Sequence, residues 1–360
     1  MKRLEQAQIS DLSVATLYHS GQILSLAGVE PRLFYQSEGA LWDFRMATWH
    51  HADLTIEPPL FYRELKARLS ESGIRLRGWT IVNHDAKGAP LVENAFGQRI
   101  PHAACPIQGR QRFGKIMDDL AQMGTFDGVD LESVGFTKAF HGAHHEITGV
   151  HITPLLQFLL SWCFCSACQS ALSEGIAWET LRQETKTDIA RLLNHDTAPQ
   201  NPMGELANFF ATNPHWAPLI KRRGHWLQEL IDESSRKFPA WSIAPILVPY
   251  DYRAQLSWLE GLIADVTQRG DLIMLGYSHP AVMREDLNWL VLDKGWDMSR
   301  VIIGQSLVGD AVPSWEEAKA RVQTALDYGI RRFSFYNFGI LNSARWQWLE
   351  HLSSIIRHEH

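Results

Sequence analysis

Four cysteines are the only thiols in the chain, and three of them fall within six positions. Cys163, Cys165 and Cys168 form a C-x-C-x-x-C cluster, and Cys105 lies upstream, directly before Pro106. Four thiolates are the donor set of a closed tetrahedral zinc site, so the pattern predicts a structural Zn²⁺. Two alternatives explain the clustering less well: small buried hydrophobic residues, and a redox disulfide in a chain that we expect to be cytoplasmic.

The segment 127–133 reads DGVDLES and holds two carboxylates two residues apart. In a strand of period two, Asp130 and Glu132 lie on the same side. Buried strand carboxylates are costly unless they are paired or functional. Glu132 is therefore our candidate for a general acid/base or nucleophile, and a structural carboxylate is the alternative. Glycoside hydrolysis needs a second carboxylate, about 5–5.5 Å away for retention, and our candidates are Asp251 first and Asp85 second.

A histidine-rich segment, FHGAHHE, follows at 140–146. Clustered imidazoles beside a carboxylate can bind substrate hydroxyl groups or ligate a transition metal. Three interpretations stay open: substrate-binding histidines, a structural hydrogen-bonding loop, and a catalytic metal site. The helical H-E-x-x-H pattern is absent from the sequence, so a metalloprotease is not supported.

The chain holds 14 tryptophans, and polar residues follow most of its predicted strands. Large aromatic side chains usually pack in cores, but the same flat faces stack on the CH faces of sugar rings. The tryptophan content and the polar strand ends together favour a carbohydrate ligand. The candidate substrate-binding residues are His19, His84, His141, His144, His145, Trp42, Trp79, Tyr250, Gln305 and Asn337.

The elements that must position these residues alternate between short β-rich runs and longer helical runs, which is typical of α/β proteins. Seven strands are predicted, at 13–18, 74–82, 128–131, 243–248, 272–275, 300–303 and 331–335. An eighth could lie at 33–36 or near Thr212. Helical sequence is predicted at 61–70, 111–123, 155–193, 219–238 and 343–356.

This alternation predicts an α/β fold, a (β/α)8 TIM barrel, as a single domain over 1–360 with helical insertions. The zinc would staple a loop region around 105–168. No G-x-G-x-x-G follows a predicted strand, which disfavours a dinucleotide-binding fold. In a TIM barrel the active site forms at the C-terminal ends of the strands, where the candidate residues above are placed.

Composition excludes several classes of function. Hydrophobic residues make up 45% of the chain, as in globular proteins, and the net charge is -6 with no basic block. Nucleic acid is therefore not an expected partner. The N-terminus lacks an apolar signal region and no apolar run is long enough to cross a bilayer, so we expect a cytoplasmic protein without membrane contact. The expected partner is a small-molecule carbohydrate; a homo-oligomer is left open.

The cysteine pattern and the strand that ends at Glu132 make the segment 100–182 resemble the zinc-binding family-42 β-galactosidases and a wider group of glycoside-hydrolase-like TIM barrels. The resemblance implies a structural zinc on the four cysteines. The chain departs from that family at Leu131, where the galactosidases carry asparagine before the acid/base glutamate. Its late strands end in Gln305 and Asn337, where no nucleophilic glutamate is found.

These features predict a glycosidase-like hydrolase that acts on a carbohydrate or sugar-derived substrate through carboxylate general acid/base chemistry. Galactose specificity is not implied. The first alternative is a metal-dependent barrel isomerase, lyase or hydrolase that uses the segment 141–146. The second is a non-catalytic carbohydrate-binding barrel.

Overall fold

A computed structural model describes most of the chain. The described residues are 2–18, 21–25, 32–36, 39–40, 58–84, 88–140, 147–194, 200–247, 271–293 and 296–358.

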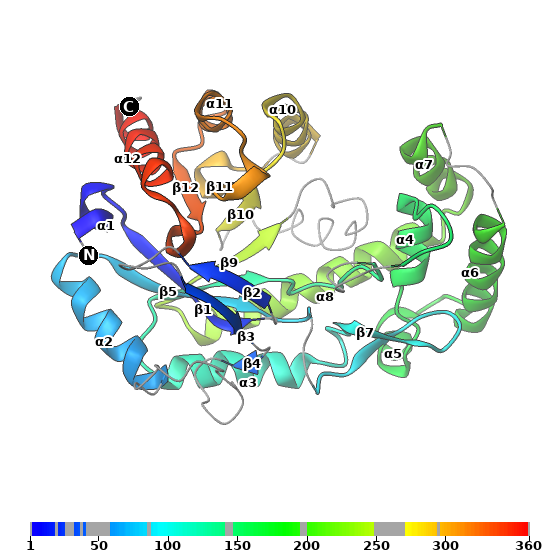
Figure 1. The fold of residues 1–360 in the computed structure, drawn as a ribbon. Coiled ribbons are helices and arrows are strands. Elements are labelled where there is room, and N and C mark those ends of the chain that lie inside the picture. Colours follow the sequence, from blue (N-terminus) through cyan, green and yellow to red (C-terminus); the bar gives the residue numbers. More distant parts are fainter. Residues whose placement is uncertain are drawn as a thin grey trace.

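The core of the fold is a curled sheet of parallel strands (Figure 1). All seven predicted strands form. They pair in chain order, and the short β4 (Gly39–Ala40) pairs antiparallel to the first of them. The parallel strands are β1 (Asp11–Tyr18), β5 (Arg75–Ile81), β8 (Gly128–Glu132), β9 (Ser242–Leu247), β10 (Leu272–Leu275), β11 (Val301–Ser306) and β12 (Arg332–Tyr336). This arrangement confirms the prediction of a TIM-barrel type of α/β fold.

The prediction of an eighth strand was wrong at both proposed positions. Residues 33–36 belong to β3 (Arg32–Gln36), which pairs antiparallel with β2 (Gly21–Ser25) in a separate two-stranded sheet. The two runs lie close in sequence, so local hairpin pairing is available to them. Thr212 ends a helix, where its hydroxyl donates a hydrogen bond of 2.9 Å to the carbonyl oxygen of Asn208.

Helices cover the outside of the sheet (Figure 1). Those connecting or flanking its strands are α1 (Lys2–Gln6), α2 (Pro58–Glu71), α3 (Arg110–Gln122), α8 (Trp216–Lys237), α10 (Pro280–Asn288), α11 (Trp315–Asp327) and α12 (Ser343–His358). Short helical turns lie at η2 (Trp289–Asp293), η3 (Met298–Arg300), η4 (Gly309–Ala311) and η5 (Phe338–Ile340).

A helical insertion follows β8 and extends to one end of the molecule, away from both termini (Figure 1). The predicted helical run 155–193 is divided there. Cys165 caps the N-terminus of the second helix, and Gly175 has a φ of +70° before the third. The insertion contains α4 (Pro154–Ser161), α5 (Ser166–Leu172), α6 (Trp178–Leu193) and α7 (Pro202–Thr212).

A hairpin that the sequence did not reveal lies between β5 and α3. Its strands are β6 (Leu91–Glu93) and β7 (Arg99–Ala104). The hairpin ends directly before Cys105, so it carries one thiol toward the insertion.

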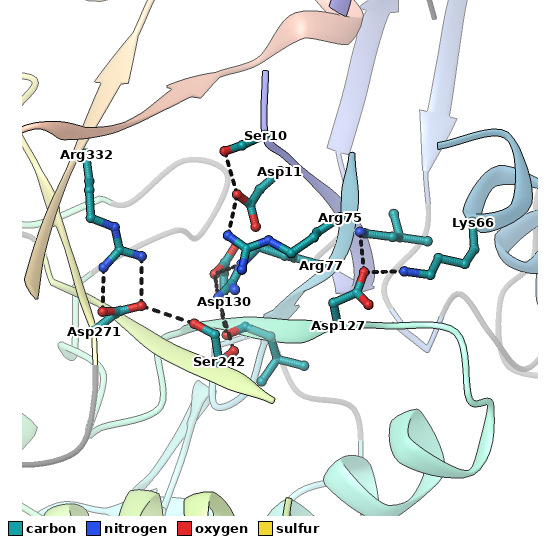
Figure 2. Close-up of polar contacts among 12 residues, drawn as sticks. Ser10, Asp11, Lys66, Arg75, Arg77, Asp127, Asp130, Ser242, Asp271 and Arg332 are labelled. Carbon is teal, nitrogen blue, oxygen red and sulfur yellow. Dashed lines mark hydrogen bonds and ion pairs between the residues drawn. The ribbon is translucent and has the colours of Figure 1, made fainter. Parts of the chain in front are cut away.

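A network of ion pairs and hydrogen bonds connects residues in the first half of several parallel strands (Figure 2). Arg77 donates hydrogen bonds of 2.9 and 2.6 Å to Asp130, which also accepts one of 2.6 Å from Ser13. Arg332 forms a two-bond ion pair with Asp271, at 2.5 and 2.8 Å. Asp130 is therefore a paired structural carboxylate, because buried charges require such partners.

Within the described residues, no single helix is long and apolar enough to cross a membrane. The helices α4 and α5 reach that length and apolar composition only when they are taken together, and the chain bends by 101° between them.

Candidate active site and metal centre

Glu132 lies with aromatic side chains from neighbouring strands at the C-terminal end of the sheet. The indole Nε1 of Trp79 donates a hydrogen bond of 2.7 Å to Oε2 of Glu132. The ring of Tyr18 meets that indole edge-on, with centroids 5.0 Å apart, and the ring of Tyr336 does the same at 5.3 Å. The four residues come from β5, β8, β1 and β12, so the curl of the sheet brings its first and last parallel strands together.

A register shift in β1 aims Tyr18 at this cluster. Ala15 pairs with Trp79 across the sheet. The next pair joins Leu17 to Thr80, so one residue of β1 is left without a partner. Such a bulge reverses the alternation of inward and outward side chains beyond it. Tyr18 consequently faces the barrel interior on the same side as Trp79.

The hydroxyl groups of Tyr18 and Tyr336 form a hydrogen-bonded pair. Burial raises the pKa of Tyr18 well above its ordinary range, and a hydrogen bond with Tyr336 and the charge of Glu132 act in the same direction. Tyr277, just after β10, adds to this effect. The Tyr18 phenol is therefore protonated at neutral pH and can donate a hydrogen bond.

The residue after Glu132 has an unusual backbone conformation. Ser133 has a φ of 51°, in the left-handed region that non-glycine residues rarely occupy. Its carbonyl oxygen accepts a hydrogen bond of 3.1 Å from the amide of Asn83. Positions of this kind cluster at functional sites, where surrounding contacts hold them.

Of the predicted site residues, Glu132 and Trp79 come together, and three others lie elsewhere around the strand ends. His84 is buried beside His102, with ring centroids 6.1 Å apart. Gln305 is buried on β11 with its amide nitrogen 4.0 Å from the sulfur of Met283. Asn337 accepts a hydrogen bond of 3.1 Å from Gly339 in the turn after β12.

The remaining predicted site residues lie outside the described part of the chain. They are His19, Trp42, Asp85, His141, His144, His145, Tyr250 and Asp251.

Sequence reasoning missed Tyr18, Tyr277 and Tyr336. Tyr18 and Tyr336 are the final residues of their strands, and the sequence analysis selected the next residue in each case, His19 and Asn337. The aromatic residues at the strand ends are a signal in the sequence, but the bulge that turns Tyr18 inward depends on pairing with a strand more than 50 positions away.

The four cysteines converge in a buried cluster, as the sequence predicted. Their sulfur atoms all lie within 4.8 Å of one another. Cys105 follows β7, Cys163 and Cys165 lie between α4 and α5, and Cys168 is in α5. Of the described residues, no other group of histidine, cysteine and carboxylate side chains is placed to hold a metal ion.

The geometry and donors of this cluster fit a tetrahedral metal ion. A tetrahedron with Zn–S bonds of about 2.3 Å has S···S edges of about 3.8 Å. The Sγ of Cys105 lies 3.8 Å from that of Cys165 and 3.5 Å from that of Cys168. Backbone amides donate to two sulfurs: Glu93 to Cys163 at 3.4 Å, and Cys168 to Cys165 at 3.5 Å. Such outer hydrogen bonds are typical of metal ligands.

Comparison with known proteins supports the fold. No family model matches the chain, and no curated protein matches it. Among solved structures, a β-galactosidase from Rahnella sp. R3 superposes with a TM-score of 0.51 at 10% identity, over 99% of this chain and 52% of that chain. The chain therefore spans about half the length of that galactosidase. At this identity the likeness establishes the barrel fold.

Two chitinase structures match with lower TM-scores. Active domain 2 of a chitinase from Pyrococcus furiosus has a TM-score of 0.41 at 10% identity, over 99% of this chain and 89% of that chain. The C-terminal domain of a putative chitinase from Desulfitobacterium hafniense DCB-2 has a TM-score of 0.44 at 10% identity, over 99% and 94%.

Proposed function

We propose that the chain is a glycosidase-like hydrolase that acts on a carbohydrate or sugar-derived substrate, with Glu132 as its general acid/base. The observation that carries this proposal is the placement of Glu132 at the C-terminal end of the parallel sheet, held by Trp79 and flanked by two tyrosines. In TIM-barrel enzymes this is the end at which catalysis occurs.

Each group in the cluster has a role in this mechanism. The carboxyl group of Glu132 would transfer a proton to or from the glycosidic oxygen, and the Trp79 indole would fix its orientation. The hydroxyl groups of Tyr18 and Tyr336 would bind sugar hydroxyls, and their rings offer apolar surface to CH groups. Asp251, with Asp85 as the second choice, remains our proposal for the other carboxylate that glycoside hydrolysis requires.

We further propose that the four-cysteine cluster binds a structural Zn²⁺, as the resemblance to the family-42 β-galactosidases implies. Bound zinc would cross-link the hairpin before Cys105 to the segment between α4 and α5. All four ligands are protein thiolates, so the ion would have no open position for a substrate.

The decisive experiment for the reaction is Glu132→Gln, assayed on a panel of aryl glycosides. Loss of a catalytic carboxyl group should lower kcat by about 10²–10⁴-fold, with little change in thermal stability. Glu64→Gln, on the exposed face of α2, is the matched control and should keep full activity. Wild-type turnover that persists in Glu132→Gln would exclude Glu132 as the acid/base.

The metal is tested separately, by elemental analysis of the purified chain. We expect one zinc per chain, lost in Cys165→Ser and kept in Ser166→Ala, which alters an exposed neighbour. Activity that disappears with a second, chelatable metal while the cysteine-bound ion stays would instead favour a metal-dependent enzyme.

A further inference from the structure

Arg223 is a buried cation stacked between two aromatic rings. It lies on α8, where 4% of its surface is exposed. Its guanidinium carbon is 3.2 Å from the ring centroid of Phe136 and 4.4 Å from that of Trp162. Both contacts are within the range of cation–π attraction. They hold the guanidinium group in place but do not neutralise its charge.

No carboxylate among the described residues pairs with Arg223. Its Nε is buried without a hydrogen-bond acceptor. Burial lowers the pKa of its guanidinium group, and the groups whose charge opposes this shift are the four cysteines, Cys168, Cys163, Cys105 and Cys165. A buried cation without a negative charge nearby is strongly unfavourable. Trp162, one of the two rings that the guanidinium group contacts, directly precedes Cys163 in the sequence, so the cysteine cluster is the place where such a charge could lie.

A divalent metal ion held by four thiolates carries two net negative charges, and this is the charge that the position of Arg223 complements. We propose that Arg223 is the fixed counter-cation of a divalent metal–tetrathiolate centre formed by the four cysteines. The inference rests on the proposed metal site and goes beyond it, because it assigns the charge of the centre and a residue that offsets one of its two negative charges.

The same residue connects the metal centre to the candidate active site. Trp162 is adjacent to Cys163, and Phe136 lies in the segment that follows Glu132. The guanidinium group is stacked between these two segments. Binding of the metal would therefore stabilise the packing of the Glu132 segment through Arg223.

The test compares wild type with Arg223→Met, both as full chains, with zinc alone as the probe. Zinc affinity is measured by competition with a chromophoric chelator, and we expect Arg223→Met to weaken it about 10–100-fold. Thermal unfolding is measured with zinc and after its removal. The variant should unfold at a lower temperature than wild type with zinc, and at an equal or higher temperature without it, because the metal-free wild type retains the unpaired cation.

Phe136→Leu is the matched control, since it removes one stacking ring and leaves the charge in place. Phe136→Leu should lower the unfolding temperature both with zinc and after its removal, while its zinc affinity stays near the wild-type value. If Arg223→Met does not fold, Arg223→Gln takes its place in the same comparison. The proposal is overturned if the charge-removing variant binds zinc as tightly as wild type, or loses equal stability with and without zinc. A wild-type chain that binds no zinc would overturn both this proposal and the metal site itself.

Discussion

The Trp79 indole and the Glu132 carboxylate are joined by a hydrogen bond of 2.7 Å between adjacent parallel strands. Arg77 and Asp130 form the equivalent diagonal pair two residues earlier on each strand. Strands β5 and β8 therefore form a buried ion pair near their middle and, at their C-terminal ends, a hydrogen bond from an uncharged indole to a carboxylate. Trp79 thus orients the carboxylate of Glu132 without bringing a positive charge of its own.

Trp79→Phe should lower kcat about 10–100-fold, because a hydrogen bond to a charged group contributes about 1.5–3 kcal/mol. The ring contacts with the tyrosines can persist in the variant, so the unfolding temperature should change little. Trp226→Phe, which alters a tryptophan on α8 beside Arg110, is the control. Equal kcat values for Trp79→Phe and wild type would show that the indole does not orient the carboxylate.

The two tyrosine hydroxyls should act as one unit. Tyr18→Phe and Tyr336→Phe each remove the same hydrogen bond, so the double variant should lose little more than either single one. A double-mutant cycle should give a coupling energy of about 1 kcal/mol between the two hydroxyls. The cycle is measured twice, once from the KM values and once from the free energies of unfolding. Fully additive losses would mean that the hydroxyls do not interact.

The Arg332–Asp271 ion pair should make stability depend on acidic pH. Burial alone would raise the pKa of Asp271, but the hydrogen bonds and charge of Arg332 outweigh it and lower the pKa. Because the pKa of Asp271 is lower in the folded than in the unfolded chain, the ion pair stabilises the fold at pH values above the unfolded-state pKa of about 3.9. This stabilisation is lost as the pH falls through the folded-state pKa.

Urea denaturation should therefore show Asp271→Asn less stable than wild type by about 1–3 kcal/mol at pH 7, with the difference shrinking below about pH 4. Asp118→Asn, which breaks the exposed pair with Lys237, should change stability little at any pH. A difference for Asp271→Asn that is constant down to about pH 2 would argue against the ion pair as its cause.

Gly128 should not tolerate a side chain. An added Cβ would overlap the Ser242 carbonyl oxygen of the paired strand and lie 2.8 Å from an Arg77 nitrogen. Gly128→Ala should cost about 3 kcal/mol or more, since the paired backbone must move. Gly114→Ala in α3 has nothing within 4 Å and should gain about 0.5–1 kcal/mol. Similar unfolding free energies for the two variants would refute the packing argument.

Strand positions could be predicted from sequence because apolar runs with period two or full burial are local signals. Leu131 and Val129 are completely buried and lie in such a run. The cysteine cluster was also predictable, since three of its four thiols lie within six positions. The 155–193 run was harder to divide, because its breaks depend on the capping by Cys165 and on the backbone of Gly175.

The inner surface of the barrel was less predictable. Asp130 and Glu132 are equivalent in the sequence pattern, and only their partners distinguish them. Arg77 neutralises the first, whereas Trp79 donates to the second without neutralising it. Those partners lie more than 50 positions away, so short-range patterns contain no information about them.

Thr16 is the residue of β1 that has no partner across the sheet, so the strand can lose this position without a change of register. Deleting Thr16 would join Ala15 directly to Leu17, keep Leu17 opposite Thr80 and leave Tyr18 on the Trp79 side of the sheet. A strand of unchanged length in which Thr16 paired regularly with Thr80 would instead place Leu17 on that side and turn Tyr18 away. Alignments of related chains can therefore carry a gap at position 16 without a change in the direction of Tyr18.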